Sequence, residues 1–266
     1  MQSLGLGHFT FLDQSPVDLV RLARRVGFAF VGLRFHPVAR GQLNWLPDAA
    51  GLRELQQVMQ GEGVTLYDIE TVVIDAALDP RDLLGALEAA ATLGARRLNT
   101  CADLFDGLPD TFARICALAE SFDMGVDLEC MAWRGLNTPA ACLDLIDRAG
   151  APNAAYLVDA LHHFRCGGTV QMLRDLPATR IASAQLCDAP LTPPQGTDGL
   201  LAEARGGRLL PDAGGLALRD LVDALPADTV ISVELPNATD LRPPLERARA
   251  IHAATFPFLN KAAPCP

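Results

Sequence analysis

Residues 126–129, VDLE, are the first of four short apolar runs that each end in a residue able to bind a hard cation. The others are AYLVD (155–159), IASAQ (181–185) and TVISVE (229–234), so the run-ending residues are Glu129, Asp159, Gln185 and Glu234. Each arrives where an aliphatic or β-branched stretch gives way to a loop. In a barrel of parallel strands such residues ring one mouth. Three carboxylates and one amide oxygen suit magnesium or manganese better than a thiol-seeking ion.

Strand-like and helix-like patterns alternate along the chain, which indicates βα units. Besides the four runs above, the expected strands are 7–13 (GHFTFLD), 28–35, 64–74 and 95–102. The expected helices are 16–26, 48–60, 80–93, 109–122, 138–149, 170–176, 216–225 and 241–254. Eight of each predict an α/β fold, a single (β/α)8 TIM barrel over residues 1–266, because such a barrel takes about 250 residues. The GxGxxG turn of a doubly wound sheet is missing after the first expected strand.

The segment from Pro190 to Gly215 is expected to be a long loop, because it is dense in proline and glycine. A loop this long in a compact barrel is usually functional or mobile, and this one begins soon after Gln185, so we expect it to cover the mouth. It contains Arg205 and Arg208, whose guanidinium groups can hold a carboxylate, phosphate or hydroxyl group of a small substrate. Arg208 is the stronger candidate, because LLP follows it and glycines follow Arg205 directly.

The composition excludes several kinds of partner. A net charge of −10 and the absence of a Lys/Arg run argue against nucleic acid. The N-terminal segment lacks the pattern of a secretory signal and no apolar stretch is long enough to span a membrane, so we expect a cytoplasmic protein with no membrane partner. A homo-oligomer is left open. Reduced thiols are expected, since the seven cysteines are scattered, odd in number and free of CxxC: Cys101, Cys116, Cys130, Cys142, Cys166, Cys187 and Cys265.

Two of the strand-ending acids have a purely structural alternative. A buried carboxylate without a partner is costly, so Glu129 and Glu234 could form salt bridges to an arginine such as Arg134 or Arg34 instead of binding a metal. All four run-ending residues together favour the metal.

Other candidates lie close to the same mouth. Glu70 and Arg34 are expected to line it, with a mutual ion pair as the alternative. Trp133 is expected to wall the pocket because it lies on the loop side of its strand.

Asp159 opens the segment DALHHFRCGG, which places His162 and Arg165 on one face of a helical turn. His162 could be a metal ligand or could donate a hydrogen bond to a substrate oxygen. Gln185 could equally satisfy backbone groups. The HExxH, GxSxG and P-loop motifs are absent, so zinc protease, serine hydrolase and kinase chemistry have no support.

Together these residues resemble the xylose-isomerase-like TIM-barrel superfamily, in the branch of sugar isomerases and epimerases that includes hydroxypyruvate isomerase and the ketose 3-epimerases. The most specific segments are VDLE, DALHHFRCG (159–167), QLCDAP (185–190), RLLP (208–211) and ISVELPN (231–237). The resemblance implies one divalent cation, manganese or magnesium before cobalt or zinc, held by the four run-ending residues, with His162 and Arg208 contacting substrate. Many relatives have histidine at the position of Gln185. The hydroxypyruvate isomerase type resembles this chain in having glutamine there.

The implied reaction is proton abstraction next to a carbonyl of a small keto sugar or hydroxy-keto acid, through a metal-stabilised enediolate. Glu129 and Glu234 would remove and return the proton. A metal-dependent lyase or dehydratase is the close alternative, since the same enediolate can expel a β-hydroxyl group. A sugar-binding barrel without turnover is a third, because PDAGGL (211–216) departs from the relatives' usual sequence. The three-zinc abasic-site endonuclease type has little support, because the chain has only five histidines and an acidic composition.

Overall fold

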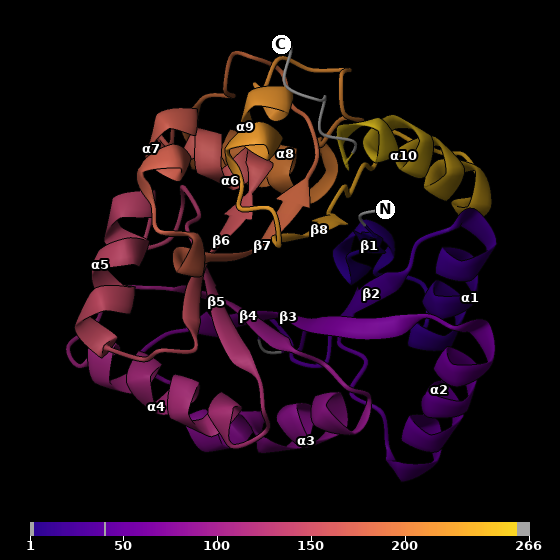
Figure 1. Cartoon of the computed structure of the whole chain (residues 1–266), viewed down its shortest axis with the longest axis horizontal. Coiled ribbons are helices and arrows are strands. Elements are labelled where there is room, and N and C mark those ends of the chain that lie inside the picture. The colour runs from indigo at the N-terminus through magenta and orange to yellow at the C-terminus, as the bar shows by residue number, and fades with distance from the viewer. Residues whose placement is uncertain (1–2, 40, 260–266) are drawn as a thin grey trace.

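The computed structural model describes residues 3–39 and 41–259. Eight parallel strands close into one barrel in sequence order (Figure 1). They are β1 (Leu4–Leu6), β2 (Phe30–Leu33), β3 (Thr65–Ile74), β4 (Arg97–Ala102), β5 (Gly125–Glu129), β6 (Ala154–Asp159), β7 (Ile181–Leu186) and β8 (Val230–Val233). The predicted (β/α)8 TIM barrel is confirmed.

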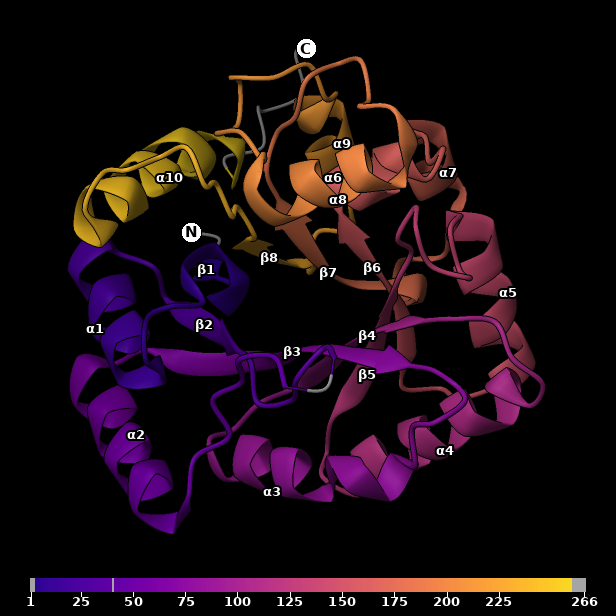
Figure 2. The ribbon, with the colours of Figure 1, turned by 180° about the vertical axis from the view of Figure 1, so that it is seen from behind.

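Helices surround this barrel, with α6 to α9 grouped beside β6, β7 and β8 (Figures 1 and 2). The α-helices are α1 (Pro16–Val26), α2 (Ala49–Glu62), α3 (Leu84–Thr92), α4 (Leu108–Glu120), α5 (Pro139–Ala149), α6 (Ala160–Arg165), α7 (Val170–Asp175), α8 (Gly196–Gly206), α9 (Leu218–Ala224) and α10 (Pro244–Leu259). Short 3-10 turns are η1 (His8–Phe11), η2 (Pro80–Leu83) and η3 (Ala178–Arg180).

The first helix shows how local sequence sets these boundaries. The Ser15 hydroxyl accepts a hydrogen bond from the Asp18 amide, and Pro16 occupies the first turn, where its missing N–H is no loss. Gly27 ends the helix with φ 108°, a conformation that glycine adopts without strain. These residues explain why the predicted and observed bounds of α1 coincide.

The expected strand over residues 7–13 is wrong. The strand is Leu4–Leu6, and the chain then turns into η1. The Gly7 amide donates to the Val233 carbonyl at 2.8 Å, but the next two amides donate to a side chain: His8 N–H and Phe9 N–H bond the Glu70 carboxylate at 2.6 and 3.2 Å. Because these amides have a side-chain acceptor, the backbone leaves the sheet early.

The expectation of a continuous loop from Pro190 to Gly215 is also wrong, since α8 lies within it. With α6, this helix brings the described part of the chain to ten α-helices rather than eight. Glu203 of α8 is nearly buried and pairs with Arg165 of α6 at 2.7 Å. The segment is held further by the Asp188 carboxylate, which accepts hydrogen bonds from the amides of Gly214 and Leu216 at 2.9 and 3.0 Å. Tertiary contacts therefore order a segment whose composition suggests a loop.

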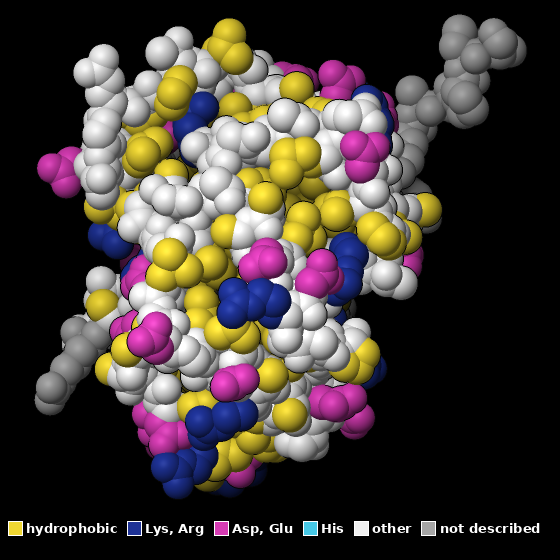
Figure 3. All heavy atoms as spheres, turned by 90° about the vertical axis from the view of Figure 1, so that its left-hand side faces the viewer, with side chains coloured by type: hydrophobic (Ala, Val, Ile, Leu, Met, Phe, Trp, Pro, Cys, Tyr) yellow, Lys and Arg dark blue, Asp and Glu magenta, His cyan; other side chains and the backbone are white. Residues whose placement is uncertain are grey.

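The six described cysteines are free and buried, while Cys265 lies outside the described residues. No helix in the described ranges combines the length and the apolar character needed to cross a membrane. The face in Figure 3 carries interspersed acidic and basic side chains. Surface ion pairs include Arg148–Asp144 within α5 and Arg180–Asp147 between η3 and α5.

Candidate metal and substrate site

The barrel brings the four run-ending residues to the same mouth. Glu129 and Asp159 are the last residues of β5 and β6, Gln185 lies next to the end of β7, and Glu234 directly follows β8. Strand register places Asp159 beside Gln185, and Gln185 beside Ser232, two residues before Glu234. All four side chains are buried. Local sequence patterns therefore located these positions correctly.

Asp159 joins the strand to the helix that carries His162. One Asp159 oxygen caps α6 by accepting a hydrogen bond from the His162 amide at 2.9 Å. The His162 Nε2 atom lies 3.9 Å from Glu129 Oε1. Glu129, Asp159 and His162 offer ligand atoms that all lie within 4.8 Å of one another, close enough to share one ion. The histidine therefore lies among the acids.

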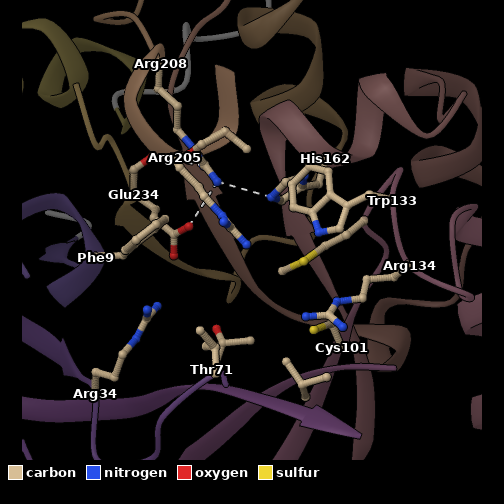
Figure 4. Close-up of a pocket in the computed structure, with 14 residues that line it drawn as sticks. Phe9, Arg34, Thr71, Cys101, Trp133, Arg134, His162, Arg205, Arg208 and Glu234 are labelled. Carbon is tan, nitrogen blue, oxygen red and sulfur yellow. Dashed lines mark hydrogen bonds and ion pairs between the residues drawn. The ribbon is translucent and has the colours of Figure 1, made fainter. Parts of the chain in front are cut away.

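Arg208 occupies the centre of this cluster. Its guanidinium group is almost fully buried and donates to Asp159 Oδ2 at 2.5 Å and to Glu234 Oε1 at 3.0 Å. It also donates to His162 Nε2 at 3.2 Å (Figure 4). The arginine thus compensates two of the acids and orients the imidazole between them.

The salt bridges considered from sequence are formed differently. Glu234 pairs with Arg208, whereas Arg134 pairs with Asp103 at 2.8 Å. Arg34 pairs with Glu70 at 3.4 Å, which is the mutual ion pair named as the alternative for those two residues. Arg134 and Arg34 therefore pair with neither Glu129 nor Glu234, the acids named in that structural alternative.

Several buried polar atoms have no hydrogen-bond partner among the described residues: Glu129 Oε1, Gln185 Oε1 and His162 Nδ1. An unmet buried acceptor costs about 1–3 kcal/mol, and more for a charged group, so such atoms call for a ligand. Two oxygen acceptors beside an imidazole form a donor set that fits a divalent cation. The chemistry of the residues and their unmet bonds therefore agree with a metal site.

Burial also changes the acidity of these groups. Burial, reinforced by Asp159 and Glu234, raises the pKa of Glu129 well above its ordinary value. Burial raises the pKa of Glu234 to about 8, although Arg208 opposes the shift. Burial acts to raise the pKa of Asp159 too, but Arg208 and His162 outweigh it and hold that pKa low. Burial lowers the pKa of His162 to about 4, so the ring is neutral near pH 7.

Glu70 ends up in a different environment from the other acids. Its Oε1 atom accepts from His8 N–H, and its Oε2 atom accepts from Phe9 N–H and from Arg34. Both oxygens are therefore occupied, and Glu70 is not part of the cavity lining. The geometry assigns this carboxylate to holding η1, although it was expected among the substrate-binding residues.

A cavity of about 60 Å³ is bordered by His162, Arg208 and Glu234 of the cluster, whereas Glu129, Asp159 and Gln185 do not line it. Trp133 lies on its wall and packs edge-on against His162, with ring centres 5.2 Å apart. The full lining is Phe9, Arg34, Val38, Thr71, Val73, Cys101, Met131, Trp133, Arg134, His162, Ala204, Arg205, Arg208 and Glu234.

Sequence reasoning did not place Phe9 and Arg134 at the cavity, because Phe9 was assigned to a strand and Arg134 was considered only as a salt-bridge partner. Arg205 was a candidate for substrate binding but ranked below Arg208. The position of Arg134 five residues after Glu129 was an available signal, because loops that follow barrel strands face the same mouth.

A closed parallel barrel with carboxylates, an amide oxygen and an imidazole at the carboxyl ends of its strands defines a (β/α)8 protein with a ligand-binding mouth. The chain belongs to the xylose isomerase-like TIM barrel family, whose model matches residues 20–256.

Similar proteins fall in the same group of barrels. A curated 3-dehydroshikimate dehydratase of Pseudomonas aeruginosa is 30% identical over 112 residues, which is 42% of this chain but only 17% of the length of that relative. The solved structure of the IolI protein with a bound zinc atom has a TM-score of 0.81 at 17% identity, covering 99% of this chain and 100% of that one. An L-ribulose 3-epimerase structure has a TM-score of 0.72 at 15% identity, covering 97% and 95%. At these identities the structural likeness establishes the fold.

Proposed function

We propose that this chain is a divalent-metal-dependent isomerase or epimerase that moves a proton next to the carbonyl of a small keto sugar or hydroxy-keto acid. The observation that carries the proposal is the buried, unpartnered Oε1 of Glu129 within the Glu129–Asp159–His162 cluster. Epimerases among the structurally similar proteins, and the zinc atom in the IolI structure, support it.

The residues proposed to hold the cation are Glu129, Asp159, Gln185 and Glu234, and His162 lies beside two of them. Oxygen ligands favour manganese or magnesium, with cobalt or zinc as alternatives. When bound, the cation supplies an electrophile that stabilises negative charge on the substrate oxygens. Arg208 keeps the pKa of Asp159 low, which maintains the ionised form that a cation requires.

Glu129 and Glu234 are the proposed proton carriers. Burial raises the pKa of both, that of Glu234 to about 8, so Glu234 can take up and release a proton near neutral pH. One carboxylate removes the proton from the carbon beside the carbonyl. The other returns a proton to the neighbouring carbon, which gives an isomer, or to the opposite face of the same carbon, which gives an epimer.

His162 and Arg208 are proposed to contact the substrate oxygens. Because His162 Nε2 accepts a hydrogen bond from Arg208, the proton of the neutral ring lies on Nδ1, which has no partner in the described structure. The Nδ1–H group can therefore donate to an oxygen that becomes negative during proton transfer. Trp133 packs against this ring and shields it from water.

The proposal is tested by metal analysis followed by hydrogen exchange. Purified protein supplied with manganese or magnesium is expected to take up one ion per chain. Proton NMR in deuterated water, with a panel of keto sugars and hydroxy-keto acids, is expected to show exchange at one carbon-bound hydrogen. Exchange should disappear in Glu234→Gln and persist in Glu120→Gln, a control at the exposed end of α4. Failure to bind any stoichiometric divalent ion would rule out the scheme, and an active Glu234→Gln would rule out the acid–base assignment.

A dehydratase is the second candidate, and the partial match to the curated 3-dehydroshikimate dehydratase favours it. A structure described as a probable 3-DHS dehydratase of Bacillus anthracis also shares the fold, with a TM-score of 0.73 at 16% identity. The same initial proton removal would then be followed by loss of a β-hydroxyl group as water. Adding 3-dehydroshikimate to the panel and following the product mass distinguishes the two, since only the dehydratase reaction lowers the mass by one water. Metal uptake without turnover of any compound would instead favour a sugar-binding barrel.

A further inference from the structure

The cavity is lined by four arginines, which is an unusual concentration of positive charge for a site that would bind a neutral sugar. They are Arg34 after β2, Arg134 after β5, Arg205 in α8 and Arg208. Figure 4 shows Arg34, Arg134 and Arg205 pointing into the cavity from different sides. Glu234 is the one acidic side chain in the described lining.

Arg34 is buried but incompletely satisfied. Its Nη2 atom donates to Glu70 at 3.4 Å, and its guanidinium carbon lies 4.6 Å from the centre of the Phe9 ring. Its Nε atom is buried and finds no acceptor within the described part of the chain. A buried guanidinium N–H without an acceptor is costly, so an acceptor supplied by a ligand would stabilise this arrangement.

Arg134 also has an N–H group without an acceptor among the residues described. Its Nη1 atom donates to Asp103 at 2.8 Å, and Asp103 is itself positioned by the Gly135 amide at 3.2 Å. The Arg134 Nε atom is buried and again has no acceptor among the residues described. Asp103 therefore holds the guanidinium group at the cavity wall while part of its donor capacity stays unused.

Arg205 contributes the charge that nothing in the described structure offsets. Asp159 and Glu234 compensate Arg208, Glu70 compensates Arg34, and Asp103 compensates Arg134. For Arg205 neither an ion pair nor another interaction is found across residues 3–39 and 41–259. Its side chain is exposed and directed over the cavity (Figure 4). Of the four cavity arginines, Arg205 is therefore the one without a carboxylate partner in the described structure.

We propose that the substrate of this site carries a carboxylate, bound by Arg205 together with the free N–H groups of Arg34 and Arg134. The inference rests on the proposed function and narrows its substrate class from keto sugars and hydroxy-keto acids to the acids. Guanidinium groups bind carboxylates through paired, charge-assisted hydrogen bonds.

The experiment compares two probes of equal carbon number on the full-length, manganese-loaded protein. Erythronate carries a carboxylate and erythritol carries a hydroxymethyl group in its place. Calorimetric titration is expected to show erythronate binding at least about tenfold more tightly, as one charge-assisted contact is typically sufficient for such a difference. Arg205→Gln should remove most of this preference and leave erythritol binding unchanged, while Arg205→Lys should retain part of it. Arg96→Gln, exposed directly before β4 on the opposite end of the barrel, is the matched control and should bind as the wild type does.

The dependence on Arg205 is the decisive readout, because a carboxylate that bound the cation instead would keep its affinity in Arg205→Gln. An unchanged erythronate affinity in that variant, equal affinities for the two probes, or binding of neither would overturn the proposal. Metal analysis of the same samples separates this result from the proposed function. Arg205-dependent erythronate binding without stoichiometric metal would reject the metal-dependent scheme and keep the carboxylate site. Metal uptake without a preference for erythronate would keep the metal-dependent scheme and reject the carboxylate site.

Discussion

The two halves of the barrel mouth use the same residue type in opposite ways. On the β1 to β4 side, both oxygens of Glu70 accept hydrogen bonds, from two backbone amides and from Arg34. On the β5 to β8 side, Glu129 is equally buried but one of its oxygens has no partner in the described structure. The two glutamates are therefore equally buried, but only Glu70 has a hydrogen-bond partner for each of its oxygens. The unmet oxygen of Glu129 marks a position available for a ligand, whereas the fully bonded Glu70 carboxylate stabilises the fold.

The physical origin of the difference lies in the backbone segment after each strand. β1 ends at Leu6, so the amides of His8 and Phe9 need acceptors, and Glu70 provides them. β6 leads directly into α6, where Asp159 serves as the cap. Glu129, at the end of β5, accepts no hydrogen bond from a backbone amide in the described structure. Its Oε1 atom therefore has no partner.

The largest effect that separates the two halves is expected from Glu129→Gln. We expect the turnover of any substrate identified by hydrogen exchange to fall by about 10³-fold, as is typical when a general acid or base is removed. The free energy of unfolding of the metal-free protein should stay level or rise, because a buried carboxylate is replaced by a neutral amide. Steady-state kinetics and urea denaturation measure both quantities. Retained turnover would remove the distinction between the halves.

Glu70→Gln is expected to show the reverse pattern. The unfolding free energy should fall by about 2 kcal/mol, since two amides and Arg34 lose a charged acceptor. Turnover should fall by less than about tenfold, because both Glu70 oxygens already bond groups of the fold. The same two measurements apply. A loss of turnover comparable to that of Glu129→Gln, with stability unaffected, would place Glu70 in the reaction.

Glu234 should make the stability of the metal-free protein depend on pH. Its pKa in the folded metal-free protein is raised to about 8 from an ordinary value of 4.5, so the folded state holds a proton that the unfolded state releases. Its contribution to stability is therefore fully present at low pH and is lost as the pH rises from 4.5 through about 8, by at most about 1.4 kcal/mol per pH unit. Urea denaturation of chelator-treated protein from pH 5 to 8 measures this slope, and Glu234→Gln should flatten it. An identical slope in both proteins would contradict the assignment.

The smallest effect is expected from Trp133→Phe. A phenyl ring can keep the edge-on contact with His162 but covers less of the cavity wall. We expect KM to rise by about threefold, with kcat within about twofold of the wild type, because the contact is apolar and similar in the ground and transition states. A large decrease in kcat alone would show that the indole group takes part in the chemistry.

How much of the site was predictable differs from residue to residue. The positions of Glu129, Asp159, Gln185 and Glu234 at strand ends could be predicted because each follows a short apolar run. The turn at His8 could not, since it depends on an acceptor more than sixty positions away. Neither could α8, which Arg165 of α6 anchors through Glu203 across 38 positions.

The sequence by itself determined the barrel and the identity of the residues at its mouth, because strand and helix periodicity and strand termination are local properties. Only the tertiary structure decided which of those residues find hydrogen-bond or ion-pair partners. Arg208 reaches Asp159 and Glu234 across 49 and 26 positions, and Arg34, Arg134 and Arg205 meet at one cavity from separate elements. Which charges pair and which donors meet depends on distances in space. These distances are set only when the barrel closes, so spacing along the chain does not reveal them.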